Sequence, residues 1–211
     1  MRAQAPHAGW RPWYDYFPWE DHRSGAPALI ARTIAPALEA WAGSGADGNA
    51  RKRRAGIDFG LDGRGWNEEL VLQRYELLYE AGLIPEARRP RQDREEPALG
   101  LPMIGDHRRI LATGIARVRA KIKYNPVVFE LMPAVFTLSQ LQRCVEAIAG
   151  LTLHKPNFRR LIEQQQLVEE TGETVSDTGG RPAKAFRFRT AVREERAAAG
   201  TKLPLRAPSS G

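Results

Sequence analysis

Residues 136–189, FTLSQLQRCVEAIAGLTLHKPNFRRLIEQQQLVEETGETVSDTGGRPAKAFRFR, contain two helical stretches followed by a glycine-tipped basic hairpin. Thr137 and Gln140 have the spacing of a capping box, and Gly150 is placed to end the first helix. Pro156 is tolerated in the first turn of the second helix. This order of elements is typical of a winged helix-turn-helix, whose second helix enters the DNA major groove. The predicted fold class is therefore mainly α with a small β wing, an α+β arrangement.

The second helical stretch combines an apolar face with polar and basic side chains at its N-terminal end. Phe158, Leu161 and Ile162 are expected to face the core. The side chains left to face outward include those of Lys155, Asn157, Arg159 and Arg160. Asparagine and arginine can read base edges, and lysine binds phosphates. We therefore predict that Asn157, Arg159 and Arg160 face the major groove and that Lys155 lies near phosphates.

The basic hairpin is predicted to place strands at 168–173 and 183–189 around the tip Gly179-Gly180. On the second strand, Phe186 and Phe188 alternate with basic residues, so the phenylalanines are expected to pack inward. The wing contacts to the DNA backbone or minor groove are predicted to come from Arg181, Lys184 and Arg187.

The 211-residue chain carries a net charge of +7, which is placed unevenly. Residues 106–190 contain 14 Lys and Arg against 8 Asp and Glu, so a net +6 lies there. A positive surface beside the predicted reading helix is what phosphate binding requires. Arg108 and Arg119 are assigned to the solvated basic face of a helix over 106–124. An ordinary basic surface is the alternative interpretation.

Motifs of catalysis and metal binding are missing from the sequence. Cys144 is the single cysteine, which excludes an intrachain disulfide and a thiolate metal cluster within one chain. Glycine-rich phosphate loops, HExxH and GxSxG do not occur. Asp15, Glu20, Asp21 and His22 could bind a metal, but a hydrogen-bonded loop is the favoured interpretation. We predict no catalytic, cofactor-binding or metal-binding residue.

Without an apolar run of membrane-spanning length or a signal-peptide pattern, we expect a cytoplasmic protein.

The N-terminal half has a different character. Residues 1–28 are rich in aromatic residues and proline, which predicts an irregular, packed segment. Helices are expected at 28–42, kinked or split by Pro36, and at 68–81, whereas the basic run 51–54 is assigned to a loop. The predicted organisation is an N-terminal aromatic and helical region (1–85), a linker (86–105), a winged-helix domain (106–190) and a flexible tail (191–211).

Three stretches, KYNPVVFELMPAVFTLSQLQRCVEAIAG, HKPNFRRLIE and TGGRPAKAFRFR, resemble the C-terminal winged-helix domain of the Nudix-related transcriptional regulators. The N-terminal half resembles a Nudix-like branch of that family, in which this part follows a Nudix core. The resemblance implies a homodimer on palindromic double-stranded DNA, an ADP-ribose-like or nucleotide-sugar effector, and a role in NAD or sugar metabolism. The N-terminal half is then expected to be the remnant or truncated tail of a sensor domain, and the upstream reading frame would decide whether Met1 is the true start.

The catalytic motif of the Nudix family, the Nudix box, is not matched as a whole. YELLYEAGL at 75–83 keeps Glu76, Glu80 and Gly82, but Tyr75 and Tyr79 stand where the motif has Arg and an essential Glu. Two carboxylates one turn apart are too few for Mg²⁺-assisted diphosphate hydrolysis. The predicted function is a DNA-binding transcriptional regulator that is not an enzyme. The alternatives are a Nudix-like hydrolase, or a fragment of one, acting on an ADP-ribose-like substrate, and a winged-helix module that binds proteins.

Overall fold

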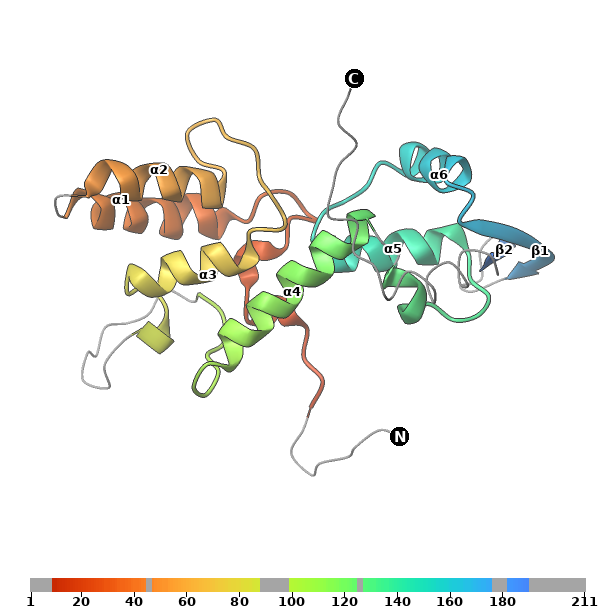
Figure 1. The fold of residues 1–211 in the computed structure, drawn as a ribbon, viewed down its shortest axis with the longest axis horizontal. Helices are drawn as coiled ribbons and strands as arrows, with labels where there is room; N and C mark the ends of the chain where they lie inside the picture. The colour runs from red at the N-terminus through yellow and green to blue at the C-terminus, as the bar shows by residue number, and fades with distance from the viewer. Residues whose placement is uncertain (1–8, 45–46, 88–98, 125–126, 176–181, 190–211) are drawn as a thin grey trace, which may run out of the picture. The chain divides into compact units, whose positions relative to one another are not determined.

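The structure is a computed structural model that describes residues 9–44, 47–87, 99–124, 127–175 and 182–189 (Figure 1). The chain divides into two compact units. The first, called here the N-terminal unit, comprises Met1–Asn125 together with Glu146–Thr152. The second, called here the C-terminal unit, comprises Pro126–Val145 and Leu153–Gly211. The predicted tail at 191–211 and most of the predicted linker lie outside the described residues.

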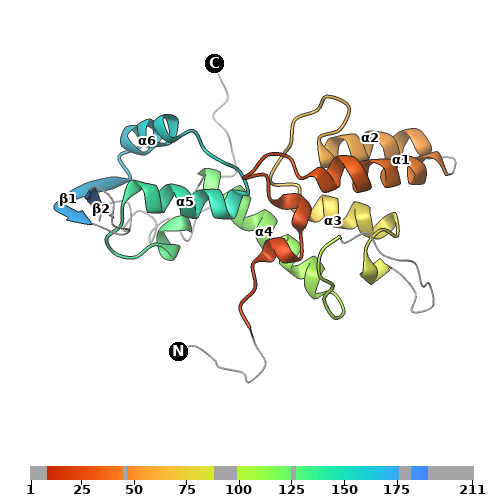
Figure 2. The same cartoon turned by 180° about the vertical axis from the view of Figure 1, so that it is seen from behind.

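The N-terminal unit is built from helices and short helical turns (Figure 2). Its short turns are η1 (Trp13–Asp15), η2 (Pro18–Glu20), η3 (Ile30–Ile34) and η4 (Pro85–Ala87). Its helices are α1 (Ala35–Gly43), α2 (Gly48–Phe59), α3 (Val71–Glu80) and α4 (His107–Tyr124). Helix α1 lies beside α2, and α3 lies beside α4 (Figures 1 and 2).

Pro36 changes the hydrogen bonding of the expected helix at 28–42 without breaking the helical run. Proline has no N–H, so the regular helical bond to the carbonyl four residues earlier cannot form there. The chain responds with the wider π-helical turn η3, in which the N–H of Ala35 donates to the carbonyl of Ile30. Ile34 and Leu38 remain fully buried, so the predicted apolar stripe is kept across the irregularity.

The basic run 51–54 lies in helix α2, so its assignment to a loop is wrong. Ala55 and Phe59, four residues apart, are buried and hold one face of α2 against the core. Arg51 lies over the ring of Trp41 at 4.5 Å, and Arg54 forms an ion pair with Glu80. The run is thus the polar face of an amphipathic helix whose apolar positions are sparse.

The aromatic N-terminal segment is irregular, as predicted, and supplies part of the core. Phe17 and Trp19 are fully buried. Their rings meet edge to face at 5.8 Å, and Phe17 packs in the same way on Tyr75 of α3. The remaining core is formed by apolar residues of the helices, among them Ile34, Leu38, Val71, Leu77, Leu78, Ile84, Ala112 and Ile115. The N-terminal unit therefore folds around its own hydrophobic core.

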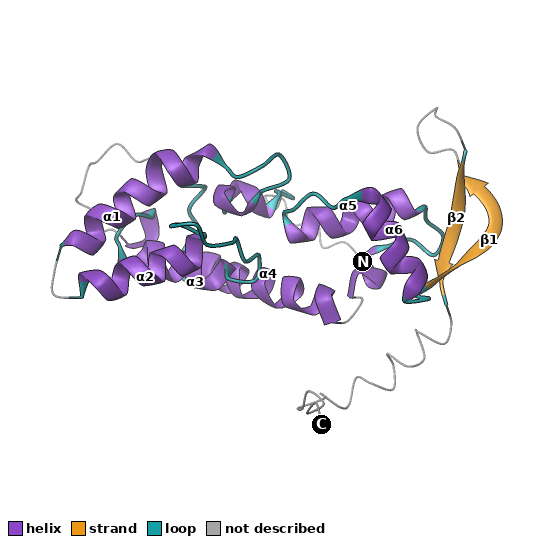
Figure 3. Ribbon diagram, turned by 90° about the horizontal axis from the view of Figure 1, so that it is seen from above, coloured by secondary structure: helices purple, strands orange, loops and turns teal. Residues whose placement is uncertain are grey.

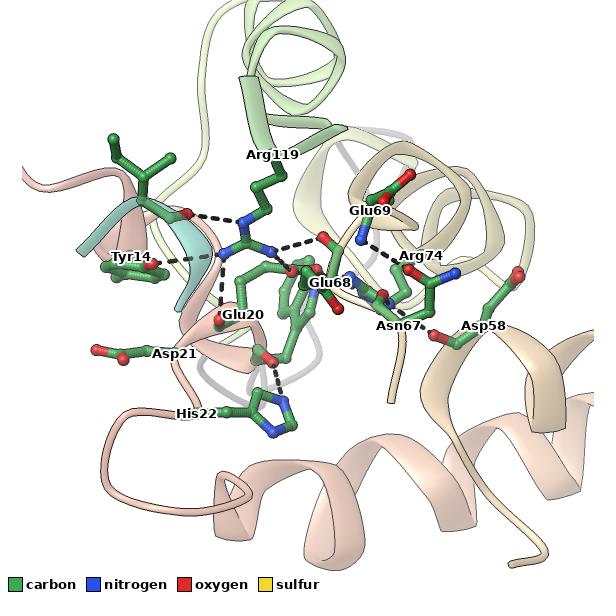
Figure 4. Close-up of polar contacts among 12 residues, drawn as sticks. Tyr14, Glu20, Asp21, His22, Asp58, Asn67, Glu68, Glu69, Arg74 and Arg119 are labelled. Atoms are coloured by element: carbon green, nitrogen blue, oxygen red, sulfur yellow. Dashed lines mark hydrogen bonds and ion pairs between the residues drawn. The ribbon is translucent and has the colours of Figure 1, made fainter. Parts of the chain in front are cut away.

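Glu20 is buried between two arginines at the centre of this unit (Figure 4). Its carboxylate accepts hydrogen bonds from Arg74 Nε at 2.6 Å and Nη2 at 2.9 Å, and from Arg119 Nη1 at 2.5 Å. All three side chains are at most 1% exposed. One carboxylate balances only one of the two positive charges. The two arginines therefore need further hydrogen-bond acceptors.

Those acceptors are backbone carbonyls at the ends of other segments. Arg74 donates to the carbonyls of Asp58 and Asn67, at 2.9 and 2.8 Å. Arg119 donates to the carbonyls of Glu68 and Ile148, at 3.0 and 2.9 Å. The network therefore joins the aromatic segment, α3 and α4 to residues 146–152.

Residues 146–152 are the end of helix α5 (Leu138–Ala149) and the turn after it. Tyr14 Oη donates to the carbonyl of Ala147 at 2.7 Å. The backbone N–H of His22 donates to the carbonyl of Gly150 at 2.7 Å. Gly150 has φ +72°, and a Cβ there would collide with the backbone of Glu20. Glycine is therefore required for this close approach as well as for ending the helix.

Arg108 is a second buried arginine, and it corrects the sequence prediction together with Arg119. Arg108 Nη1 donates to Glu86 at 3.1 Å, and Nη2 donates to the carbonyls of Leu99 and Tyr16. Burial lowers the pKa of Arg108. Arg108 and Arg119 therefore do not belong to the solvated basic face expected for α4, because each is committed to buried acceptors.

Carboxylates that could have bound a metal or magnesium-nucleotide are paired instead. Glu76 forms an ion pair with Arg109, Glu80 pairs with Arg54, and Asp21 pairs with Arg23. Across the described ranges, no group of three His, Cys, Asp or Glu side chains could hold a metal ion. In the same part of the chain, no helix is long and apolar enough to cross a membrane.

His22 gives the N-terminal unit a predicted pH dependence. Its ring stacks on Trp66 at 3.8 Å, and Nε2 bonds to the carbonyl of Trp19 at 3.1 Å. Burial lowers the pKa of His22 below its usual 6.5, and the charges of Arg74 and Arg119 add to this, against the Trp19 carbonyl and Glu20. Below pH 6.5 the His22 ring is therefore protonated in the unfolded chain while it is still neutral in the folded unit. The free energy of unfolding of this unit falls as the pH drops below 6.5.

We expect the wild-type N-terminal unit to lose more thermal stability than His22→Phe between pH 7.5 and 5.5. The phenylalanine keeps a ring on Trp66 but cannot be protonated. Tryptophan emission measures this unit alone, because all five tryptophans lie in residues 10–66. Equal losses of Tm in both proteins would contradict the assignment.

The C-terminal unit contains the helical turn η5 (Val127–Leu131), most of α5, helix α6 (Lys155–Gln164), and strands β1 (Val168–Val175) and β2 (Ala183–Phe188) (Figure 3). The fold class is confirmed: the chain is mainly helical with a small two-stranded antiparallel sheet. The predicted winged-helix domain begins at residue 106 and so includes helix α4, whereas the second compact unit begins at Pro126. Helix α4 belongs to the N-terminal unit, because Ala112 and Ile115 pack in that core.

Candidate nucleic-acid interface

The predicted capping box sets the start of α5. The Thr137 N–H donates to Gln140 Oε1 at 2.7 Å, and the Gln140 N–H donates to Thr137 Oγ1 at 3.2 Å. Leu138 and Leu141 are buried, as the apolar stripe predicted. Gln142 Nε2 donates to the carbonyl of Leu153 at 2.9 Å, which fixes the connection towards α6.

Helix α6 begins at Lys155 with Pro156 in its first turn, as predicted. Phe158 and Ile162 are 7% and 8% exposed, and they hold one face of the helix in the core. Residues spaced four apart share a helix face, so the opposite face is turned to solvent.

Strands β1 and β2 form the wing. The register pairs Glu169 with Arg187 and Glu170 with Phe186, and then shifts before Thr174 pairs with Lys184. Gly172, with φ +81°, lies in this irregular stretch. The strand β1 reaches Val175, two residues beyond the predicted end.

Phe136 forms an isolated antiparallel β-bridge to β2, which the sequence did not predict. Its N–H and carbonyl exchange hydrogen bonds with Phe186 at 2.9 and 2.8 Å. The Phe136 ring lies 4.5 Å from that of Phe188. Ala185 lies on the opposite face of β2 from Phe186 and is fully buried, so the face expected to point outward is also packed at this position.

The N-terminal end of α6 presents the predicted reading residues. Lys155, Asn157, Arg159 and Arg160 are all exposed. Within the described residues, none of these four side chains has a hydrogen-bond or ion-pair partner. Unpaired donors on a rigid helix are free to bind acceptors on another molecule without first breaking an internal contact.

Leu161 does not face the core, which corrects the sequence analysis. It is 49% exposed, against 7% and 8% for Phe158 and Ile162. The spacing explains this, because Phe158 and Ile162 lie four apart at the centre of the buried face and Leu161 falls at its edge. The exposed face of α6 is a row spaced i, i+3, i+4, i+7: Asn157, Arg160, Leu161 and Gln164. Sequence reasoning missed Leu161 and Gln164 as members of this row.

The two described cations predicted for the wing are paired with carboxylates on the facing strand. Lys184 Nζ lies 2.8 Å from Glu170 Oε1, and Arg187 Nε lies 2.6 Å from Glu169 Oε1. All four side chains are exposed to solvent, by 36% to 69%. Such pairs are weak, so an incoming phosphate can compete for the cations. Arg181 and the glycine tip lie outside the described residues.

Comparison with known proteins supports the interpretation of the C-terminal unit as a winged helix. Residues 128–188 match the family model of the NrtR DNA-binding winged helix domain. The match begins after α4, in line with the placement of α4 in the N-terminal unit. The winged-helix fold and the resemblance on which it was predicted are confirmed for this segment.

Two known proteins are similar over part of the chain. The ADPR responsive transcriptional repressor NtrR of Acinetobacter baylyi is 40% identical over 93 residues, which is 44% of this chain. This chain spans 37% of the length of that relative. The crystal structure of Shewanella oneidensis NrtR complexed with a 27mer DNA is 28% identical, covering 46% of this chain and 43% of that one, with a TM-score of 0.40.

Proposed function

We propose that this protein is a DNA-binding transcriptional regulator that places α6 in the major groove. One observation carries the proposal: the N-terminal end of α6 exposes Lys155, Asn157, Arg159 and Arg160, none of which has a partner among the described residues, on the helix that enters DNA in winged-helix proteins. Asn157, Arg159 and Arg160 would contact base edges, and Lys155 would contact phosphate. Arg181, Lys184 and Arg187 would hold the wing against the backbone or minor groove.

We also propose an ADP-ribose-like effector, because the Acinetobacter relative is named as an ADPR-responsive repressor. The N-terminal unit would take part in sensing this effector, and the protein would act as a homodimer in the compartment that holds the DNA. Hydrolase activity is not part of the proposal, since Glu76 and Glu80 are each paired with an arginine. Mg²⁺-dependent turnover of ADP-ribose by the purified chain would require the hydrolase alternative instead.

The direct test is selection of bound duplexes from a random-sequence DNA pool by the full chain. We expect a defined sequence to be enriched. The logarithm of the binding constant should fall linearly with the logarithm of the salt concentration, with a slope of about −0.9 for each phosphate contacted. Failure to enrich any sequence would overturn the proposal. Salt-independent capture of a protein through α6 would favour the protein-interaction alternative.

The wing makes a separate prediction. Glu170→Gln is expected to tighten binding to the selected DNA by about threefold, because it releases Lys184 and removes a negative charge near phosphates. The gain should largely vanish in a Lys184→Gln background. Glu39→Gln, in the N-terminal unit, removes the same charge and serves as the control. If the two glutamate variants behave alike, Lys184 does not contact the DNA.

A further inference from the structure

Leu161 is an apolar side chain in the middle of an otherwise polar row. Asn157, Arg160 and Gln164 share its face of α6, and the leucine is 49% exposed. A lone exposed leucine on another surface would need no explanation. Here its neighbours are the residue types that pair with base edges: Arg with guanine, and Asn or Gln with adenine.

One feature of the major groove is itself apolar. The C5-methyl group of thymine projects into the groove and distinguishes a T·A pair by contact with an apolar side chain. Leu161 is 49% exposed, so part of its surface is already removed from water before any partner binds. Covering its exposed half with a methyl group removes apolar surface from water on both partners.

We infer that Leu161 is a specificity-determining residue that reads a thymine methyl group in the major groove. The inference rests on the proposed function, and it adds to it a base type and an apolar contact. Arg160 and Asn157, on the same face, would read the neighbouring base pairs. The sequence recognised by α6 therefore contains a thymine whose methyl group contributes to affinity.

The experiment uses the full chain and the sequence selected from the random pool. Each thymine in turn is replaced by deoxyuridine, which removes only the methyl group. We expect one thymine per bound α6 at which the wild type loses about fourfold in affinity, the ratio for burying one methyl group. Leu161→Ala should bind the thymine duplex about fourfold more weakly than the wild type and bind both duplexes equally, whereas Leu161→Met should keep the preference for thymine.

Controls separate this inference from the proposed function. Leu131→Ala truncates another exposed leucine of the C-terminal unit, 59% exposed, and should keep the wild-type response to deoxyuridine. Circular dichroism checks folding, because this unit contains no tryptophan.

Enrichment of a sequence without any thymine effect, or with the same effect in Leu161→Ala, overturns the inference and leaves the proposed function standing. Loss of self-association in Leu161→Ala with unchanged DNA specificity assigns the leucine to a protein contact and also overturns it. Failure to enrich any sequence overturns both.

Discussion

Arg159→Ala combined with Arg160→Ala is expected to reduce binding to the selected DNA by about 100-fold or more. Each arginine that contacts a base edge contributes about 1–3 kcal/mol. Both side chains are exposed and have no partner among the described residues, so their removal leaves no internal group unsatisfied. The loss should therefore appear in DNA affinity with little change in folding. Fluorescence anisotropy of a labelled duplex measures the first, and circular dichroism measures the second.

A charge-matched control separates contact from net charge. Lys52→Ala combined with Arg53→Ala removes the same two positive charges from α2, where both side chains are exposed. If long-range attraction alone were responsible, both double variants would weaken binding to a similar degree. We expect the α2 variant to retain affinity within about threefold at 150 mM salt, where exposed charges more than ~8 Å apart are largely screened.

Salt dependence divides the roles along α6. Lys155→Ala is expected to weaken binding to all sequences about equally and to reduce the salt slope by about one. The arginine variant should instead relax the sequence preference. If Lys155→Ala changes the preference and the arginines change only the slope, the assigned roles of the helix are reversed.

Periodicity and capping were enough to predict α4, α5, α6 and the hairpin. Thr137 and Gln140 act within one turn, and Phe158 and Ile162 reflect a simple spacing, so their environment follows from neighbouring residues. Helix α2 was missed because the run Arg51 to Arg54 conceals a buried face of only a few residues, including Ala55 and Phe59.

The buried charges could not be predicted, because their partners are distant in the sequence. Arg119 meets Glu20 across 99 positions, and Arg108 meets Glu86 across 22. A basic residue on a basic helix is normally solvated. Arg108 and Arg119 share one face of α4 with the buried Ala112 and Ile115, at spacings of i, i+4, i+7 and i+11, but only the tertiary structure shows which acceptors they meet. The candidate interface shows the same limit at Leu161, where a residue at the edge of a helix face is buried or exposed according to what packs beside it.

Glu20→Gln is expected to destabilise the N-terminal unit by about 3–5 kcal/mol, because it leaves Arg74 and Arg119 buried with an uncharged partner. Tryptophan emission reports this unit alone, since all five tryptophans lie in residues 10–66. Asp21→Asn is the matched control. Asp21 also pairs with an arginine, Arg23, but both side chains are partly exposed to solvent, so the loss of that pair should cost at most about 1 kcal/mol.

Replacing the whole network by apolar residues tests what the arginines do besides neutralising Glu20. In some proteins a buried ion-pair network can be exchanged for apolar side chains without loss. Here Arg74 and Arg119 also donate to the carbonyls of Asp58, Asn67, Glu68 and Ile148, which an apolar set would leave unsatisfied. The triple variant Glu20→Leu, Arg74→Met, Arg119→Met should therefore remain less stable than the wild type. Recovery of the wild-type Tm would mean that the carbonyl contacts contribute little, and that the network is a charge cluster only.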